Sequence, residues 1–199
     1  MKVSHSPKAQ RAFLLSGGKM NKKRLMKLIL AALFLAAAYL LPFLTGSNFK
    51  LGQMFCPMHI PVMLCGMICG PVWGLVVGAV APILRGLTVG APAFPVTALP
   101  MAFELAVYGL STGLLRKLFP KKFVFLYPNL LISMVLGRVV NGLVQYVMFS
   151  LGVTEKAFAL GVYVNTVTVT AIPAIIIQLA VIPPLVMLSD RLLKKYKLD

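Results

Sequence analysis

CPMHIPVMLCGMICGPVWGLVVGAVAPILRGL, residues 56–87, is the stretch of sequence that decides the fold of this chain. It is apolar apart from His59 and Arg85, and Gly70-Pro71 near its middle is a natural turn between two helices. A helix needs about 20 residues to cross the hydrocarbon of a bilayer, so two crossings here would have to be short. Whether the stretch crosses once or twice fixes the topology of the whole chain, and the basic residues around it decide between the two.

Basic residues gather in three clusters at the ends of apolar segments. The chain has 20 Lys and Arg against four acids, 59% hydrophobic residues and a mean hydropathy of +0.90, which is typical of a protein embedded in lipid. If all three clusters are cytoplasmic, as the positive-inside rule indicates, even numbers of crossings separate them, four and then two. The clusters are Lys19, Lys22, Lys23, Arg24 and Lys27, then Arg116, Lys117, Lys121 and Lys122, and finally Arg191, Lys194, Lys195 and Lys197.

The sequence therefore predicts an all-α membrane protein with six transmembrane helices and both termini cytoplasmic. The second and third spans are expected to be short. Three connections then lie outside, at residues 46–56, 88–99 and 150–165, and they are rich in Gly, Pro and Asn, as loops that cover a binding site would be. The predicted spans are residues 27–45, 57–70, 71–87, 100–115, 124–149 and 166–188.

Residues 20–199 are predicted to form one domain, since no internal repeat is visible and six spans are too few for the usual twelve-helix transporter layout. Residues 1–19 are polar and lack helical periodicity, which indicates a flexible basic tail, a cloning remnant or residues upstream of a start at Met20. A cleaved signal peptide is the alternative for the first span. The apolar run continues through Pro42, which favours a retained helix.

Three charged residues, Arg85, Glu104 and Arg138, stand alone inside apolar spans. A charged side chain at the bilayer centre costs about 2.5–3.5 kcal/mol on insertion scales, so these residues are expected to line a cavity instead of facing lipid. The chain is therefore predicted to bind a polar solute. Arg85 lies near the outer end of its span, where extension to the membrane interface is the alternative.

The fifth span carries Arg138, Asn141 and Gln145 at spacings of three and four, so the three side chains share one helical face. One guanidinium and two amides in line can grip a carboxylate and the neighbouring amide or hydroxyl groups of a ligand. Interhelical hydrogen bonding is the alternative role for such residues in a membrane bundle. We favour ligand binding, because an Arg is costlier to bury than an amide.

Glu104 and Tyr108 lie one helical turn apart in the fourth span. Glu104 is the only acid within the predicted spans, and pairing with Arg138 or Arg85 is its simplest stabilisation. A ligand contact or a proton-coupling role is an equal alternative. Asn165, at the start of the sixth span, is a further candidate for the binding site.

Cys56, His59, Cys65 and Cys69 lie among several Met residues around the second span, which is compatible with a path for a soft metal. Their spacing matches no compact zinc motif, and free Cys and Met are ordinary apolar residues inside proteins, so no metal site is predicted. His59 is interpreted as a residue that starts a helix or anchors a loop.

Several enzyme motifs are missing from the sequence. It has no G-x-x-x-x-G-K-[ST] loop, no H-E-x-x-H and no pair of nearby carboxylates that could share acid and base roles or hold magnesium. The chain is therefore predicted not to be an enzyme, to hold no cofactor and to have no nucleic-acid partner. Transport driven by ATP would need the nucleotide on another subunit.

The sequence resembles the substrate-binding S-components of energy-coupling factor (ECF) vitamin transporters over residues 20–199. The resemblance rests on the six predicted spans with a short second and third helix, and on the pattern Ala32-Leu33-Phe34-Leu35-Ala36 in the first. It also rests on the run His59-Ile60-Pro61-Val62, followed by Gly66 and Gly70-Pro71, which looks like the corresponding stretch of pantothenate- and folate-type S-components.

The resemblance implies a multi-pass subunit of the bacterial cell membrane, surrounded by lipid, that captures a vitamin-like molecule outside. It would dock through Ala32 and Ala36 onto a membrane-embedded coupling subunit that bears two cytoplasmic ATPases, and the three outer connections would gate its pocket. Pantothenate is the expected substrate, with riboflavin, folate or another small organic molecule as alternatives. A stand-alone small transporter, which would not need the Ala32 and Ala36 face, is the alternative from a different class.

Overall fold

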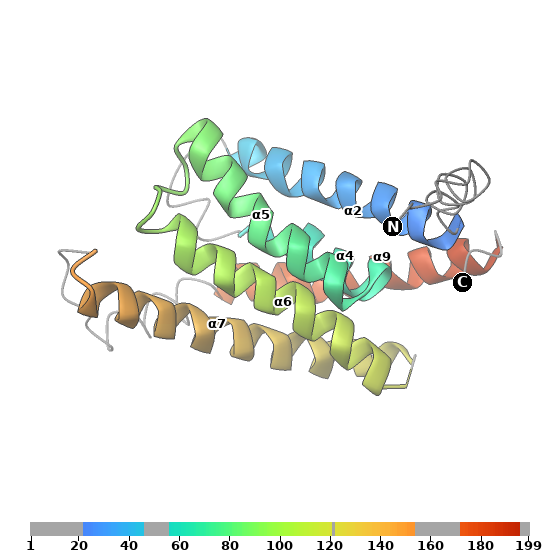
Figure 1. The fold of residues 1–199 in the computed structure, drawn as a ribbon. Helices are drawn as coiled ribbons and strands as arrows, with labels where there is room; N and C mark the ends of the chain where they lie inside the picture. Colours follow the sequence, from blue (N-terminus) through green and yellow to red (C-terminus); the bar gives the residue numbers. More distant parts are fainter. Residues whose placement is uncertain (1–21, 46–55, 121, 154–171, 196–199) are drawn as a thin grey trace, which may run out of the picture.

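The computed structural model describes residues 22–45, 56–120, 122–153 and 172–195, and every regular element among them is helical (Figure 1). Five helices are long and apolar enough to cross a membrane, and α4 is a shorter apolar helix. The predicted all-α bundle is therefore confirmed, while residues 1–19 lie outside the described ranges. The elements are α2 (Lys22–Leu40), η1 (Leu41–Thr45), α4 (His59–Cys69), α5 (Pro71–Val89), α6 (Ala98–Leu118), η2 (Phe123–Phe125), α7 (Leu126–Ser150) and α9 (Ile172–Lys195).

The lengths of α4 and α5 agree only in part with the prediction. α4 has 11 residues and is short, as expected. α5 has 19 residues and is long enough to span, so the prediction of a short third span was wrong. α5 is longer than predicted because the residue that ends it is Gly90. The φ of Gly90 is 74°, which is the left-handed conformation that commonly ends a helix.

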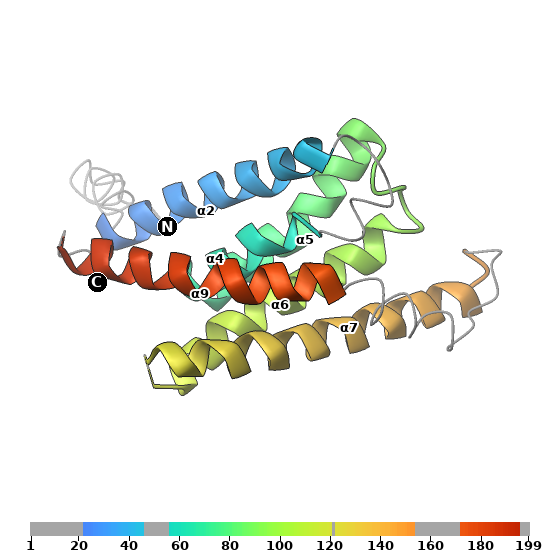
Figure 2. The same cartoon turned by 180° about the vertical axis from the view of Figure 1, so that it is seen from behind.

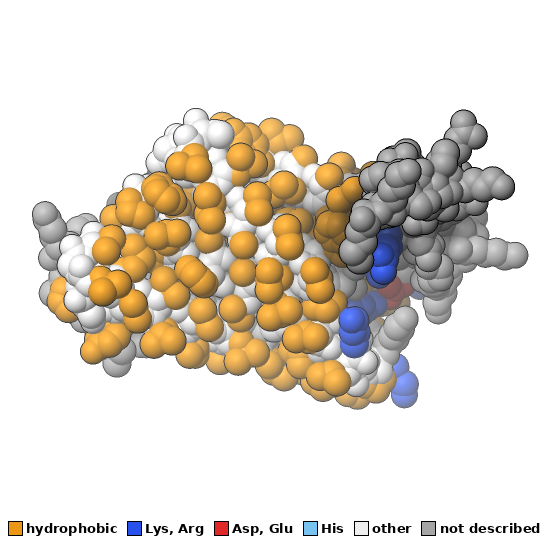
Figure 3. Space-filling view, in the orientation of Figure 1, with side chains coloured by type: hydrophobic (Ala, Val, Ile, Leu, Met, Phe, Trp, Pro, Cys, Tyr) orange, Lys and Arg blue, Asp and Glu red, His pale blue; other side chains and the backbone are white. Residues whose placement is uncertain are grey.

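The ends predicted to be cytoplasmic lie together at one end of the bundle. Figures 1 and 2 show the start of α2, the end of α9, the α6–α7 connection and the α4–α5 turn at this end. On the face drawn in Figure 3, Lys and Arg gather there, and the surface along the helices is apolar. We call it the basic end and the opposite one the outer end. The three basic clusters thus share one end, as the predicted even numbers of crossings between them require, and the positive-inside rule remains the ground for expecting this end to face the cytoplasm.

Gly70 makes the turn between α4 and α5. Its φ of 106° is a conformation that glycine adopts readily and other residues avoid, and its backbone N–H donates to the carbonyl of Gly66. Pro71 then opens α5 at a position where the missing N–H removes no hydrogen bond. The turn predicted at Gly70-Pro71 is therefore confirmed.

Glycines bring the backbones of α4, α5 and α6 into direct contact. A methyl group added to Gly109 of α6 would overlap the backbone of Gly74 in α5, and one added to Gly66 of α4 would overlap the carbonyl of Gly109. Gly78 of α5 lies equally close to the backbone of Leu105. Small residues allow this approach in membrane bundles, where close packing is a main source of helix association. We call these three helices the glycine-packed unit.

α2 packs against α4 and α5 with one side only. Ala31 and Ala38 on that side are buried, whereas Ala32 and Ala36 are exposed on the other. Leu33 beside them is 63% exposed, so the exposed side of α2 is apolar. We call Ala32 and Ala36 the alanine face. In this bundle it lies on the outside, where another helix can approach closely.

Candidate ligand-binding site

Glu104 of α6 is the centre of a group of buried and half-buried polar side chains from α4, α6 and α7. Its carboxylate accepts a hydrogen bond from the hydroxyl of Tyr108 at 2.6 Å and another from Nδ2 of Asn141 at 2.7 Å. Nε2 of His59 lies 3.8 Å from its Oε1. Donors that converge in this way allow a carboxylate to be kept inside a membrane bundle.

α7 extends this arrangement by one turn on either side of Asn141. Nε2 of Gln145 donates to Oδ1 of Asn141 at 2.5 Å, so a chain of hydrogen bonds runs from Gln145 through Asn141 to Glu104. Arg138 is close enough for its charge to act on Glu104 and for its side chain to interact with Tyr108. The face predicted for α7 is thus directed at α6. We call the following side chains the polar cluster: His59, Glu104, Tyr108, Arg138, Asn141 and Gln145.

Packing fixes the position of Tyr108. The residue is fully buried, and its ring lies so close to Gly137 of α7 that a methyl group there would overlap it. The ring centroids of Tyr108 and His59 are 5.3 Å apart. With both sides of the ring occupied, the hydroxyl is held in place before any ligand arrives, as a well-ordered binding site requires.

His59 was not among the predicted site residues. It is the first residue of α4, as expected of a residue that starts a helix, but it also lies beside Glu104 and Tyr108. Its side chain is 7% exposed, and its Nδ1 has no hydrogen-bond partner among the described residues. A buried ring nitrogen in this state is unfavourable, which makes Nδ1 a candidate contact for a ligand. The only sequence signal was its place in the His-Ile-Pro-Val run.

Arg85 lies elsewhere. Its guanidinium donates to the backbone carbonyl of Tyr39 at 2.8 Å and sits 4.4 Å from the ring centroid of Phe43. The residue is buried between α2, η1 and α5, so it does not extend into the membrane interface. The structure does not bring Arg85 to Glu104, and the pairing of these two residues that the sequence left open is not formed.

The other candidate residues are Asn165 and the three cysteines. Asn165 lies outside the described residues, and Cys65 and Cys69 are buried in α4. Burial, followed by the negative charge of Glu104, raises the pKa of the Cys56 thiol to about 12, so this thiol stays protonated at neutral pH. Within the described part of the chain, no three side chains of His, Cys, Asp or Glu come together in an arrangement that could hold a metal ion.

Residues 26–186 match a protein-family model described as "ECF transporter, substrate-specific component". The match covers most of the chain and includes every residue of the polar cluster. No curated protein and no solved structure matches the chain.

Proposed function

This chain belongs to the substrate-specific components of ECF transporters, and from that premise we propose that the polar cluster binds the transported molecule. Membership makes the chain a multi-pass membrane protein and a substrate-binding subunit of a transporter for vitamins or related micronutrients, not an enzyme. It also implies association with ECF coupling and ATPase subunits.

The observation that carries the proposal is the convergence of three helices on Glu104. α4 supplies His59, α6 supplies the carboxylate itself, and α7 supplies Asn141 with Arg138 close by. Nδ1 of His59 is a buried hydrogen-bonding atom that no side chain or backbone group of the described residues uses. A site that combines a carboxylate, a guanidinium, amides and an imidazole suits a small molecule with both an acidic group and hydroxyl or amide groups.

Among micronutrients, pantothenate fits this chemistry best. Its single carboxylate complements Arg138, its two hydroxyls can donate to Glu104, and its amide matches the side chain of Gln145. Riboflavin, folate and other small organic molecules are the competitors. Riboflavin lacks a carboxylate, and folate is much larger, so a binding comparison among the three tests the assignment directly.

Arg138→Ala is expected to lose the bound molecule. Purified wild-type protein should release a stoichiometric small compound that mass spectrometry can identify, and the variant should be empty. A hydrogen bond to a charged group contributes about 1.5–3 kcal/mol, which corresponds to roughly a 10- to 150-fold weaker complex. Val139→Ala is the matched control, since this neighbouring side chain is 64% exposed on the lipid side.

Two results would contradict the proposal. A compound retained equally by Arg138→Ala would assign Arg138 to structure. If wild-type protein carries no compound, the purified protein is titrated with pantothenate, riboflavin and folate. Saturable binding of one of them that Arg138→Ala weakens keeps the cluster as the site, and binding that the variant leaves unchanged removes it.

We further propose that the alanine face docks onto the membrane-embedded coupling subunit, which bears two ATPases, in the bacterial cell membrane. Ala32 and Ala36 are exposed one turn apart on α2, where small side chains permit close helix contact. Ala36→Trp is therefore expected to reduce uptake in cells at least tenfold while ligand binding by the purified protein stays unchanged, because the indole would hold the partner helix away.

Val135→Trp provides the control for this experiment. Val135 is 61% exposed on α7, which lies on the opposite side of the bundle from α2 (Figure 1). Val135→Trp should leave both uptake and ligand binding unaffected. Uptake that is insensitive to Ala36→Trp would support a stand-alone transporter instead.

A further inference from the structure

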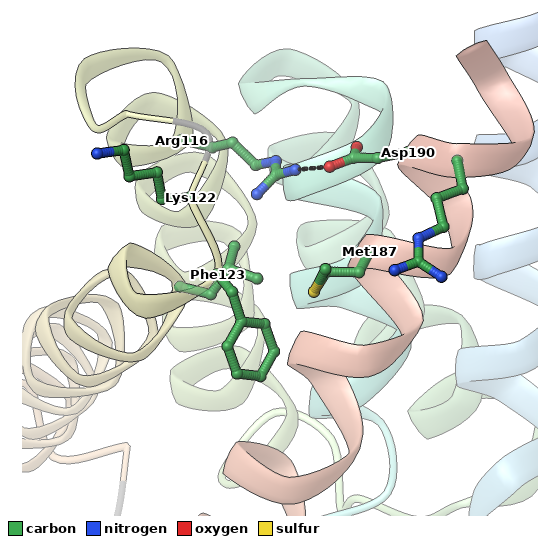
Figure 4. A pocket seen from close by; sticks show the side chains of 7 residues that line it. Arg116, Lys122, Phe123, Met187 and Asp190 are labelled. Atoms are coloured by element: carbon green, nitrogen blue, oxygen red, sulfur yellow. Dashed lines mark hydrogen bonds and ion pairs between the residues drawn. The ribbon is translucent and has the colours of Figure 1, made fainter.

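A second polar site lies at the basic end, far along the bundle from the outer connections. It is a pocket of about 220 Å³ between the last turn of α6, the start of α7 and the last turns of α9. Arg116, Lys122, Arg191 and Asp190 line it. Figure 4 shows Arg116 and Asp190 pointing toward each other across the pocket.

The pocket has an excess of positive charge. Arg116 donates to the carboxylate of Asp190, and this pair joins α6 to α9. Asp190 is the one acid among the lining residues, against Arg116, Lys122 and Arg191, so a formal excess of two positive charges remains. Figure 4 shows the Lys122 side chain extending away from the Arg116–Asp190 pair. Of the other acids, Glu104 belongs to the polar cluster, and Glu155 and Asp199 lie outside the described residues. Lys122 and Arg191 thus supply the positive charge that an anion in this pocket would need.

The remaining walls of the pocket are apolar. Phe123, Leu126 and Met187 line it, and Figure 4 shows Phe123 and Met187 beside the charged pair. Val124 and Leu188, which follow two of these residues in sequence, are 71% and 54% exposed. The pocket is therefore bordered by side chains that face lipid, which gives a hydrocarbon chain a continuous apolar surface to lie on.

Aromatic rings mark the depth of this pocket in the membrane. Phe123 packs edge-on against Tyr127 with 5.4 Å between ring centroids, and Phe119 lies 5.9 Å from Phe125. Tyr is enriched in the region where hydrocarbon meets head groups, and Tyr127 lies here with Lys and Arg at the end of apolar helices. The pocket therefore lies at the level of the cytoplasmic head groups.

We propose that this pocket binds one anionic phospholipid of the cytoplasmic leaflet. Arg191 binds the phosphate, and the exposed Lys122 turns toward it by a change of rotamer. Arg116 adds a donor while it remains paired with Asp190, and an acyl chain lies along Phe123 and Met187. Basic pockets between helices on the cytoplasmic side suit lipid phosphates, and a free phosphate would leave the apolar walls uncovered. The bound lipid would fill the gap between α7 and α9 at this end.

The test is native mass spectrometry of the full chain in detergent, titrated with phosphatidylglycerol, phosphatidylcholine or glycerol 3-phosphate. We expect one phosphatidylglycerol to stay bound, and neither of the others to be retained. Each Lys or Arg near an anionic lipid contributes a factor of about five, so Lys122→Gln combined with Arg191→Gln should weaken phosphatidylglycerol binding roughly 30-fold. Arg116 is left unchanged so that the α6–α9 ion pair is preserved.

Arg24→Gln combined with Lys117→Gln is the matched control. It removes the same charge from exposed positions at the same end without touching the pocket. The control should bind phosphatidylglycerol like the wild type, and both double variants should unfold at the wild-type temperature in phosphatidylcholine. If both double variants lost phosphatidylglycerol binding equally, general surface charge and not the pocket would retain the lipid. If glycerol 3-phosphate bound as well as phosphatidylglycerol, the pocket would be a phosphate site. Either result overturns the lipid assignment, as does equal retention of the two lipids.

Discussion

Glu104→Gln is expected to weaken ligand binding about 100-fold, within the range expected for Arg138→Ala. The carboxylate accepts from Tyr108 and Asn141 through its two oxygens. Glutamine has one oxygen, so its NH₂ group must face one of these donors, and the positive charge of Arg138 also loses its counterpart. Calorimetric titration with the molecule that co-purifies with the wild type measures the loss.

Two further variants separate binding from folding. Tyr108→Phe keeps the ring against Gly137 and removes one donor, so binding should weaken about tenfold. Phe103→Leu changes the residue before Glu104, which is 52% exposed to lipid, and should leave binding unchanged. If Glu104→Gln binds normally while it lowers the unfolding temperature, Glu104 serves as a structural acceptor and the ligand lies elsewhere.

Gly109→Ala is expected to destabilise the fold by about 3 kcal/mol, at the upper end for the insertion of a methyl group into a packed core. The added carbon would overlap the backbone of Gly74, which cannot rotate away as a side chain could. α5 and α6 must therefore separate along their length, and the contacts of Gly66 and Gly78 in the glycine-packed unit are disturbed with them. Thermal unfolding in detergent, followed by circular dichroism, measures the change.

Val80→Ile is the matched control for Gly109→Ala. It also adds one carbon, but on a side chain of α5 that is 39% exposed, and its unfolding temperature should stay within error of the wild type. If Gly109→Ala proved as stable as this control, the close approach of α5 and α6 would not limit stability, and the glycine-packed unit would be able to loosen without cost.

The topology was predictable because the relevant signals are local. Charge clusters mark helix ends whatever the tertiary packing of the helices, and Gly70-Pro71 specifies a turn within two residues. The length of α5 was missed because apolar composition alone does not show where a helix stops. α5 ends at Gly90, which has a left-handed conformation. This glycine lies within residues 88–99, which are predicted from the sequence to form a loop.

The candidate site was predictable only where its residues share a helix. Arg138, Asn141 and Gln145 follow from periodicity, whereas the approach of His59 to Glu104 depends on how α4 packs on α6. The partners of Arg85 were likewise not predictable from the sequence. The cost of burying its charge can be read from the sequence, but its partners are the backbone carbonyl of Tyr39 and the ring of Phe43, and neither carries a signal of charge.

The shortness of α4 has an electrical consequence. Its 11 residues rise about 16 Å from the basic end, roughly half of the hydrocarbon thickness, so a bilayer centred on the bundle would hold His59 near its mid-depth with Glu104 beside it. A unit charge that crosses a potential of 100 mV changes energy by about 2.3 kcal/mol, and one that stops halfway by about half of this. With the inside negative, an anion that reached this site from outside would therefore bind about sevenfold more weakly per 100 mV, whereas a molecule without net charge would be unaffected.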